Sequence, residues 1–237
     1  MAIENLPKAW PPYPVEPWPP DDTEESVLGT DLHQTTITNL RLGINQAARV
    51  GKKHGEPSAW RAFTQITLIG CSRPDGSSYR TLPDVFVYGL ATDENRGSIS
   101  IAAEGPPLLI AEVMSESNYE TDVDFIRGKG YSYARAGVPE YLILDVMGLF
   151  LKERLIGWRL VDGAYRRWEP DGDGRLHSAQ LPLVFHLEGM LAVVSLPDGR
   201  RMLHEDSAEE ELARRDEELA RKDEELARLR RLLRESR

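Results

Sequence analysis

The sequence contains a single cysteine, Cys71, among its 237 residues. A lone thiol excludes a disulfide framework within the chain, and it excludes zinc or iron–sulfur sites built from several thiolates. Long apolar runs are also missing, because no stretch approaches the ~20 apolar residues that a membrane span requires. The N-terminus lacks a charged segment followed by an apolar block, so no export signal is expected. These absences predict a cytoplasmic protein without a membrane partner.

Positive charge is in the minority, with 29 Lys and Arg residues against 39 Asp and Glu residues and a formal net charge of −10. This balance excludes a globally basic coat for nucleic acid, although it leaves room for a local basic groove. Several nucleotide-binding and hydrolase signatures are absent: Gly-x-Gly-x-x-Gly after a strand, the Walker Gly-Lys-Ser/Thr, and the Gly-x-Ser-x-Gly elbow. No two of the five histidines are three or four residues apart, which argues against a helical zinc motif.

Three segments differ sharply in composition. Residues 1–20 hold seven prolines, so we expect an extended arm without a core of its own. Residues 204–237 lack proline and glycine, and leucines recur every seven residues from Leu212 to Leu233 among mixed charges. We expect a charged C-terminal helix whose thin apolar seam is adequate for a short coiled coil, and hence for a homodimer. A solvated single helix is the alternative. The globular domain is then predicted over residues 21–203.

The globular domain alternates helical and strand-like patterns. Helical spacing of Ile37, Leu40 and Ile44 predicts a first helix over about 31–50, and similar spacing predicts a second over 121–136. Apolar runs bounded by turn residues predict strands. The predicted strands are 63–69, 82–88, 108–114, 141–146, 149–155, 157–161, 164–168, 181–187 and 191–196, with a break at Gly157. This order favours an α/β fold with a mixed sheet over a doubly wound one.

Two acidic residues lie within unusually apolar strands. Asp84 and Glu112 belong to segments that are apolar on both faces, which is typical of strands covered on each side. They alternate with Phe86 and Ile110, so each is predicted to point towards a covered face. An ionised carboxylate there loses several kcal/mol of hydration unless a cation compensates. One such acid could simply reach solvent at a strand end. Two acids on neighbouring strands favour a divalent-metal site.

Lys129 is the cationic residue that we expect beside these acids. The spacing of Val123, Ile126 and Ala134 defines a buried stripe on the second helix and places Lys129 on its flank. From that position its amine can extend along the sheet surface towards the carboxylates. A lysine on a solvated helix face is the alternative.

These residues also resemble a known family. Segments 83–85, 106–115 and 131–145, together with Lys129, occur in the order typical of the Uma-two family, which belongs to the restriction-endonuclease-like PD-(D/E)XK phosphodiesterase superfamily. The similarity is dense over 82–146, and a charged terminal helix is common in the family. The resemblance implies a restriction-endonuclease-like mixed sheet flanked by helices.

The resemblance also implies catalytic roles. Asp84 matches the family's proline–aspartate acid, and Glu112 matches its second acid. The superfamily's lysine ordinarily lies two residues further on, where this chain has Met114. In the Uma-two family that lysine lies on the following helix, where Lys129 matches it. Ser115 matches the serine after the second acid, and a turn-capping hydroxyl is the alternative.

The resemblance implies metal-dependent hydrolysis of DNA. Asp84 and Glu112, with the Val113 carbonyl, would hold one Mg²⁺ or Mn²⁺, and Lys129 would orient the attacking water. His33 lies one turn before Ile37 on the first helix, from which family members often direct a polar residue towards the site. A histidine at the edge of the core is the alternative.

Two other functions remain open from the sequence. The chain could be a catalytically silent nuclease-like interaction protein that recruits partners through its helical tail or proline arm. It could also be a metal-dependent phosphodiesterase that acts on RNA or on a small nucleotide. Metal binding separates the first alternative from an endonuclease, and a substrate panel separates the second.

Overall fold

The computed structural model describes residues 24–50, 52, 59–89, 97–115, 128–202, 204 and 221–222. The chain divides into two compact units, Met1–Met202 and Leu203–Arg237, and the helices and strands below belong to the first. Within the described ranges, no helix is both long enough and apolar enough to cross a membrane. The predicted proline-rich arm lies outside these ranges. The predicted C-terminal helix falls almost wholly outside them, so it stays a prediction.

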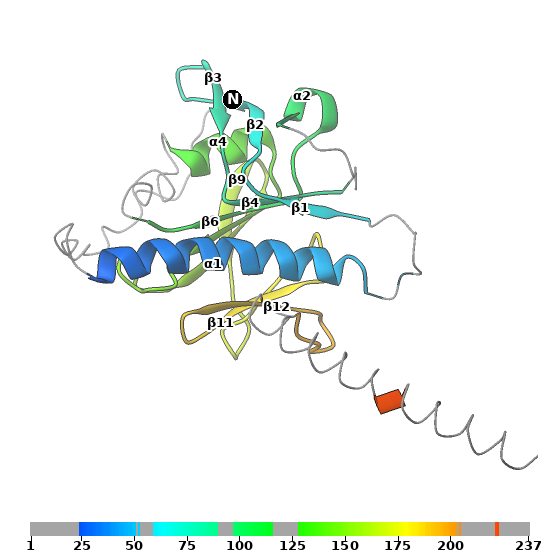
Figure 1. The fold of residues 1–237 in the computed structure, drawn as a ribbon. Helices are drawn as coiled ribbons and strands as arrows, with labels where there is room; N and C mark the ends of the chain where they lie inside the picture. The colour runs from blue at the N-terminus through cyan, green and yellow to red at the C-terminus, as the bar shows by residue number, and fades with distance from the viewer. Residues whose placement is uncertain are drawn as a thin grey trace, which may run out of the picture. The chain divides into compact units, whose positions relative to one another are not determined.

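A six-stranded sheet forms the centre of the first unit, in the order β1-β4-β6-β7-β8-β9 (Figure 1). Its strands are β1 (Arg61–Phe63), β4 (Val85–Tyr88), β6 (Leu109–Val113), β7 (Glu140–Leu144), β8 (Leu155–Val161) and β9 (Ala164–Trp168). The pair β6–β7 is parallel, and the other neighbouring pairs are antiparallel. The prediction of an α/β fold with a mixed sheet is therefore confirmed.

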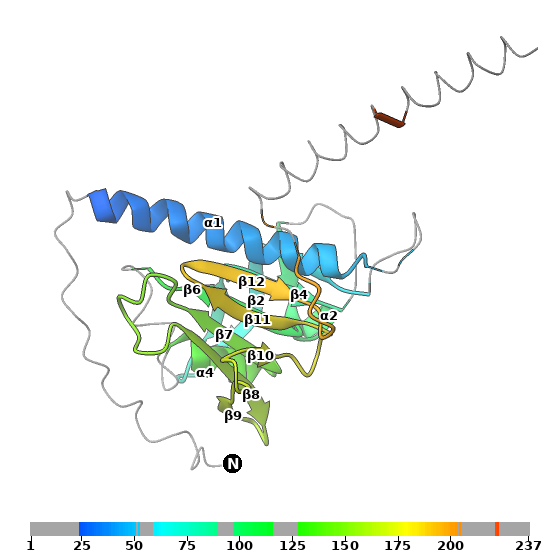
Figure 2. The same ribbon diagram turned by 90° about the horizontal axis from the view of Figure 1, so that it is seen from below.

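Each face of this sheet is covered by a helix and a small sheet (Figures 1 and 2). One face packs against the long helix α1 (Glu24–Ala47) and a sheet whose strand β12 lies against α1. The other face packs against the short helix α4 (Lys129–Ala136) and a second sheet, in which β2 contacts α4. The remaining elements are β2 (Thr67–Ser72), β3 (Ser78–Thr81), β5 (Ser98–Ser100), α2 (Ile101–Glu104), β10 (Leu176–His177), β11 (Val184–Glu188) and β12 (Leu191–Ser195).

The alternation of side chains along β6 divides the core in two. Leu109, Ala111 and Val113 belong to the cluster under α1, whereas Ile110 belongs to the cluster under α4. All five residues of β6 are buried. Because successive side chains of a strand point to opposite faces, Glu112 lies on the same face as Ile110, towards α4.

Several predicted boundaries are wrong at points where the backbone turns. The first helix ends at Ala47 rather than near residue 50, and it begins at Glu24. The predicted strand 63–69 is divided between β1 and β2, which are separated by Gln65 in the left-handed region at φ 57°. The predicted strand 82–88 begins only at Val85, because Leu82 lies in the preceding connection with 57% of its surface exposed.

The predicted strand 149–155 is also wrong. Asp145 is buried at the end of β7, and its two carboxylate oxygens accept backbone N–H groups from four residues between 148 and 151. This bonding shapes the segment into a turn, so the next strand starts at Leu155 and continues through Gly157.

Contrary to prediction, β8 continues through Gly157. The absence of a side chain at Gly157 leaves room for the Trp168 ring of the neighbouring strand. Gly157 pairs with Trp168 of β9, and a Cβ atom at Gly157 would lie 2.6 Å from Trp168 Cε3. Only glycine lets the indole ring lie over the neighbouring strand at that distance.

The second helix is described from Lys129 to Ala136. Gly128 is its N-cap residue, and Gly137 ends it in the left-handed conformation at φ 82°. The rest of the predicted helix, including Val123 and Ile126, lies outside the described residues.

Candidate active site

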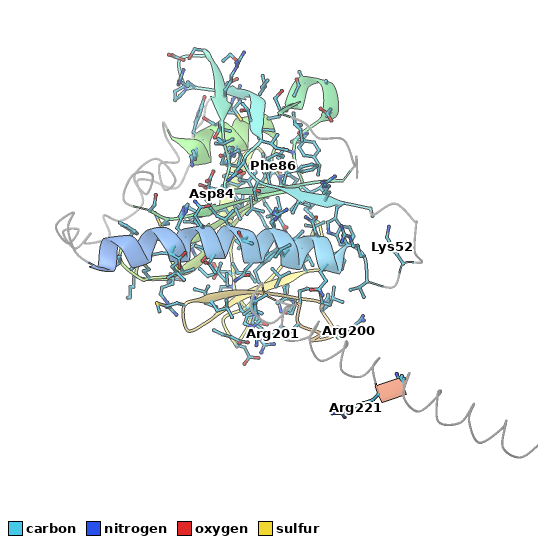
Figure 3. All side chains as sticks on the ribbon, in the orientation of Figure 1. Lys52, Asp84, Phe86, Arg200, Arg201 and Arg221 are labelled. Atoms are coloured by element: carbon cyan, nitrogen blue, oxygen red, sulfur yellow. The ribbon has the colours of Figure 1, made fainter. Side chains whose placement is uncertain are left out.

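The register of β4 and β6 brings the two predicted acids together. Val85 pairs with Ala111 in antiparallel register, so Asp84, one residue earlier, lies opposite Glu112, one residue later. Figure 3 shows Asp84 between α1 and α4, with Phe86 further along β4. The backbone N–H of Asp84 donates to Glu112 Oε2 over 3.3 Å, which joins the two positions directly.

Glu112 is completely buried, and donors reach both of its oxygens. Lys129 Nζ from α4 lies 3.0 Å from Glu112 Oε2. The Tyr133 hydroxyl, one helical turn further along α4, donates to Glu112 Oε1 over 2.6 Å. A buried carboxylate requires this kind of compensation, because charge-assisted hydrogen bonds replace the hydration that burial removes.

Asp84 links the strand ends to α1. Its Oδ2 atom accepts the Val113 backbone N–H over 2.8 Å and lies 3.7 Å from His33 Nε2. The same His33 nitrogen lies 2.9 Å from the Val113 carbonyl oxygen. Because a carbonyl oxygen can only accept, Nε2 carries the proton in this contact. His33 therefore contacts both Asp84 and the main-chain carbonyl predicted to bind metal.

The cluster is closed at its base and partly open at its rim. The side chains of His33 and Asp84 are each 16% exposed, and that of Lys129 is 13% exposed, whereas Glu112 has no exposed surface. A small cation or a phosphate oxygen approaching from solvent would reach the rim residues first.

Tyr133 belongs to this cluster as well, although it is not among the site residues predicted from the sequence. The residue is fully buried, and its hydroxyl also lies 3.1 Å from Thr81 Oγ1 at the end of β3. Burial, followed by the negative charge of Glu112, raises the pKa of the Tyr133 hydroxyl well above its usual range, so it stays protonated as a donor. The spacing of four residues from Lys129 was the available signal, since such residues share a helix face.

Ser115 lies two residues beyond β6 and is half-buried. Its role at the site stays a prediction. Across the described part of the chain, no three His, Cys, Asp or Glu side chains form a group able to hold a metal ion by themselves.

The oxygen atoms at this site nevertheless suit a hard divalent cation as ligands. Asp84 and Glu112 supply carboxylate oxygens, and the Val113 carbonyl is a main-chain oxygen beside them. Mg²⁺ is commonly bound through one or two carboxylates, with water and substrate phosphate completing its shell. The Lys129 amine, 3.0 Å from Glu112 Oε2, is a cationic group at the same carboxylate.

The chain is similar to a known protein family over most of its length. A family model, Uma2, described as "Putative restriction endonuclease", matches residues 23–193. The chain belongs to the Uma2 family. The match includes α1, the whole central sheet and every residue of the cluster described above. Comparisons with curated proteins and with solved structures gave no match.

Proposed function

We propose that this Uma2 protein is a metal-dependent endonuclease that hydrolyses phosphodiester bonds in DNA. The observation that carries the proposal is the pairing of Lys129 with a fully buried Glu112, directly beside the partly exposed Asp84. Such a combination of two acids and one amine is costly to assemble in a core, and it supplies the charges that phosphodiester hydrolysis needs. Membership of a family described as restriction endonucleases supports DNA as the substrate.

Asp84, Glu112 and the Val113 carbonyl would hold one Mg²⁺ or Mn²⁺ ion. When bound, the ion lowers the pKa of water and offsets negative charge on the scissile phosphate. The Val113 N–H keeps Asp84 Oδ2 directed towards the end of β6. The N–H of His33 engages the Val113 carbonyl and so fixes the position of that main-chain oxygen.

Lys129 would act on the attacking water and on the developing phosphorane charge. Its amine is held 3.0 Å from Glu112 and retains a little contact with solvent. It can therefore donate hydrogen bonds both to the carboxylate and to a water or phosphate oxygen at the rim. Ser115, half-buried just after β6, is proposed as a secondary contact to the same phosphate.

The test is nicking of supercoiled plasmid by the purified full chain with Mg²⁺ or Mn²⁺ and with EDTA. We expect metal-dependent nicking that yields 5′-phosphate ends, and a loss of at least ~100-fold in Asp84→Asn and Lys129→Met. Asp173→Asn, which alters an exposed aspartate, is the matched control and should cleave like the wild type. Circular dichroism verifies that each variant is folded at the assay temperature.

Unchanged nicking in Asp84→Asn would refute the assignment of this site. A folded wild-type protein with no affinity for Mg²⁺ or Mn²⁺ would instead favour the silent interaction protein. Parallel assays on single-stranded RNA and on small phosphodiesters test the alternative substrates.

A further inference from the structure

A closed set of bonds connects the two acids. The Asp84 N–H donates to one oxygen of Glu112, and the Tyr133 hydroxyl donates to the other. Tyr133 in turn contacts Thr81, and Thr81 and Asp84 are only three positions apart in the sequence. The position of one acid relative to the other therefore depends on a buried ring of hydrogen bonds.

The chemistry of these groups decides which one donates and which one accepts in each hydrogen bond of the ring. Ionised Glu112 can only accept, so Tyr133 must give its single proton to Glu112 Oε1. The Thr81 hydroxyl is left to donate to the Tyr133 oxygen. Tyr133 and Glu112 have no exposed surface, and Thr81 is 4% exposed, so water does not compete for these bonds.

We propose that Tyr133 is a positioning residue that holds the Glu112 carboxylate in the orientation in which its Oε2 atom faces Asp84, the acid with which it would hold a divalent ion. The proposal rests on the function proposed above. Oε1 is committed to a short bond of 2.6 Å inside the core, whereas Oε2 is the oxygen that Lys129 and the Asp84 N–H contact.

Packing alone does not explain the hydroxyl of Tyr133. Its ring packs edge-on against Tyr141, with ring centroids 5.2 Å apart, and a phenylalanine would keep that contact. The hydroxyl adds the link between Thr81 and Glu112. Groups that orient metal ligands typically change metal affinity by 10–100-fold when removed.

The experiment compares two buried tyrosines of the same core cluster. Tyr133→Phe removes the hydroxyl on Glu112, and Tyr165→Phe removes a buried hydroxyl that donates to the Val138 carbonyl over 3.0 Å. Calorimetric titration of the full chain with Mn²⁺ gives the dissociation constant and the stoichiometry, and plasmid nicking at several Mn²⁺ concentrations gives the rate at saturation.

We expect the wild-type chain to bind Mn²⁺. The dissociation constant should rise at least 10-fold in Tyr133→Phe and change less than about two-fold in Tyr165→Phe. Nicking by Tyr133→Phe should recover at saturating Mn²⁺, because Asp84, Glu112 and Lys129 remain. Thr81→Val should raise the dissociation constant in the same direction by a smaller factor, and it provides the same test if Tyr133→Phe does not fold.

Equal dissociation constants for Tyr133→Phe and Tyr165→Phe, with a wild type that binds and cleaves, would overturn the role of Tyr133 and leave the endonuclease assignment standing. Absence of Mn²⁺ binding and of nicking in the wild type would overturn both proposals together.

Discussion

Replacing Lys129 by methionine removes the positive charge next to a carboxylate that has no exposed surface. Methionine keeps a similar length and leaves α4 able to pack, so the change isolates the charge. Breaking a buried ion pair by removing one partner typically costs 3–5 kcal/mol, because the other charge remains buried. Glu112 keeps the Tyr133 hydroxyl and the Asp84 N–H as donors, so we expect a value near the lower limit, about 3 kcal/mol at pH 7.

Urea denaturation followed by circular dichroism measures this change as a shift of the unfolding midpoint at constant slope. Lys152→Met is the matched control, because Lys152 is exposed, and it should change the free energy of unfolding by less than ~0.5 kcal/mol. The double variant Glu112→Gln/Lys129→Met has no buried charge at the pair, and we expect it to recover about 2 kcal/mol relative to Lys129→Met.

The effect of Mn²⁺ on the free energy of unfolding provides a second, independent measurement at this site. If a divalent ion occupies the acids, Mn²⁺ at 100 times its dissociation constant should stabilise the folded protein by about 2.7 kcal/mol. This gain should be retained in Lys129→Met, where the ion replaces the missing charge, and lost in Glu112→Gln/Lys129→Met. A Lys129→Met protein as stable as Lys152→Met would refute the argument that Glu112 depends on this amine. Stabilisation of the double variant by Mn²⁺ would show that the ion binds elsewhere.

Two further predictions concern the fold. Gly157→Ala would force a Cβ atom to within 2.6 Å of the Trp168 ring, and we expect a loss of about 1–3 kcal/mol in urea denaturation, whereas Gly172→Ala, with open space around it, should be neutral. Burial raises the pKa of Cys71 to about 12 from 9.0, so its thiol should resist iodoacetamide at pH 8 until the protein unfolds. Above pH 9 the unfolded thiol ionises while the folded one does not, so stability should fall with rising pH, by about 1.4 kcal/mol per unit. Cys71→Ala should show a shallower decline between pH 9 and 10, and an identical slope would contradict the burial argument.

The sequence was sufficient to predict the features that follow from local periodicity. Alternation along 108–114 predicts that Glu112 points towards a covered face, and the strand β6 is buried throughout. Helical spacing predicts Lys129 at the flank of a buried stripe, and its amine lies 3.0 Å from Glu112. Both predictions need only the geometry of one element and the fact that its neighbours cover it.

Features that depend on a partner far away in the sequence could not be predicted. Gly157 looks like a strand break until Trp168 is known to lie against it, because a glycine favours breaks and close contacts alike. Tyr133 looks like an ordinary core aromatic until β3 brings Thr81 to its hydroxyl. Strands as short as β3 and β5 carry little periodic signal, so their pairing, and the contact that it creates, could not be predicted from the sequence.

Burial of a carboxylate does not by itself identify an active site in this protein, since Glu112, Glu140 and Asp145 are all almost fully buried. Asp145 accepts four backbone N–H groups at the end of β7. Glu140 is satisfied by Arg159, by the Ser178 hydroxyl and by the Ala179 backbone N–H.

Backbone N–H groups of a turn compensate the charge of Asp145, and Arg159 compensates that of Glu140. In the paired strands, no second acid lies opposite either of them. Glu112 differs because Asp84 is placed directly opposite it at the rim, where 16% of the Asp84 side chain remains exposed. The lysine at this pair lies on Glu112, whereas Asp84 has the His33 ring nitrogen 3.7 Å from Oδ2 and is the acid that a cation from solvent can reach. That difference is the reason why we propose this pair, rather than Glu140 or Asp145, as the site of the metal ion and of phosphodiester hydrolysis.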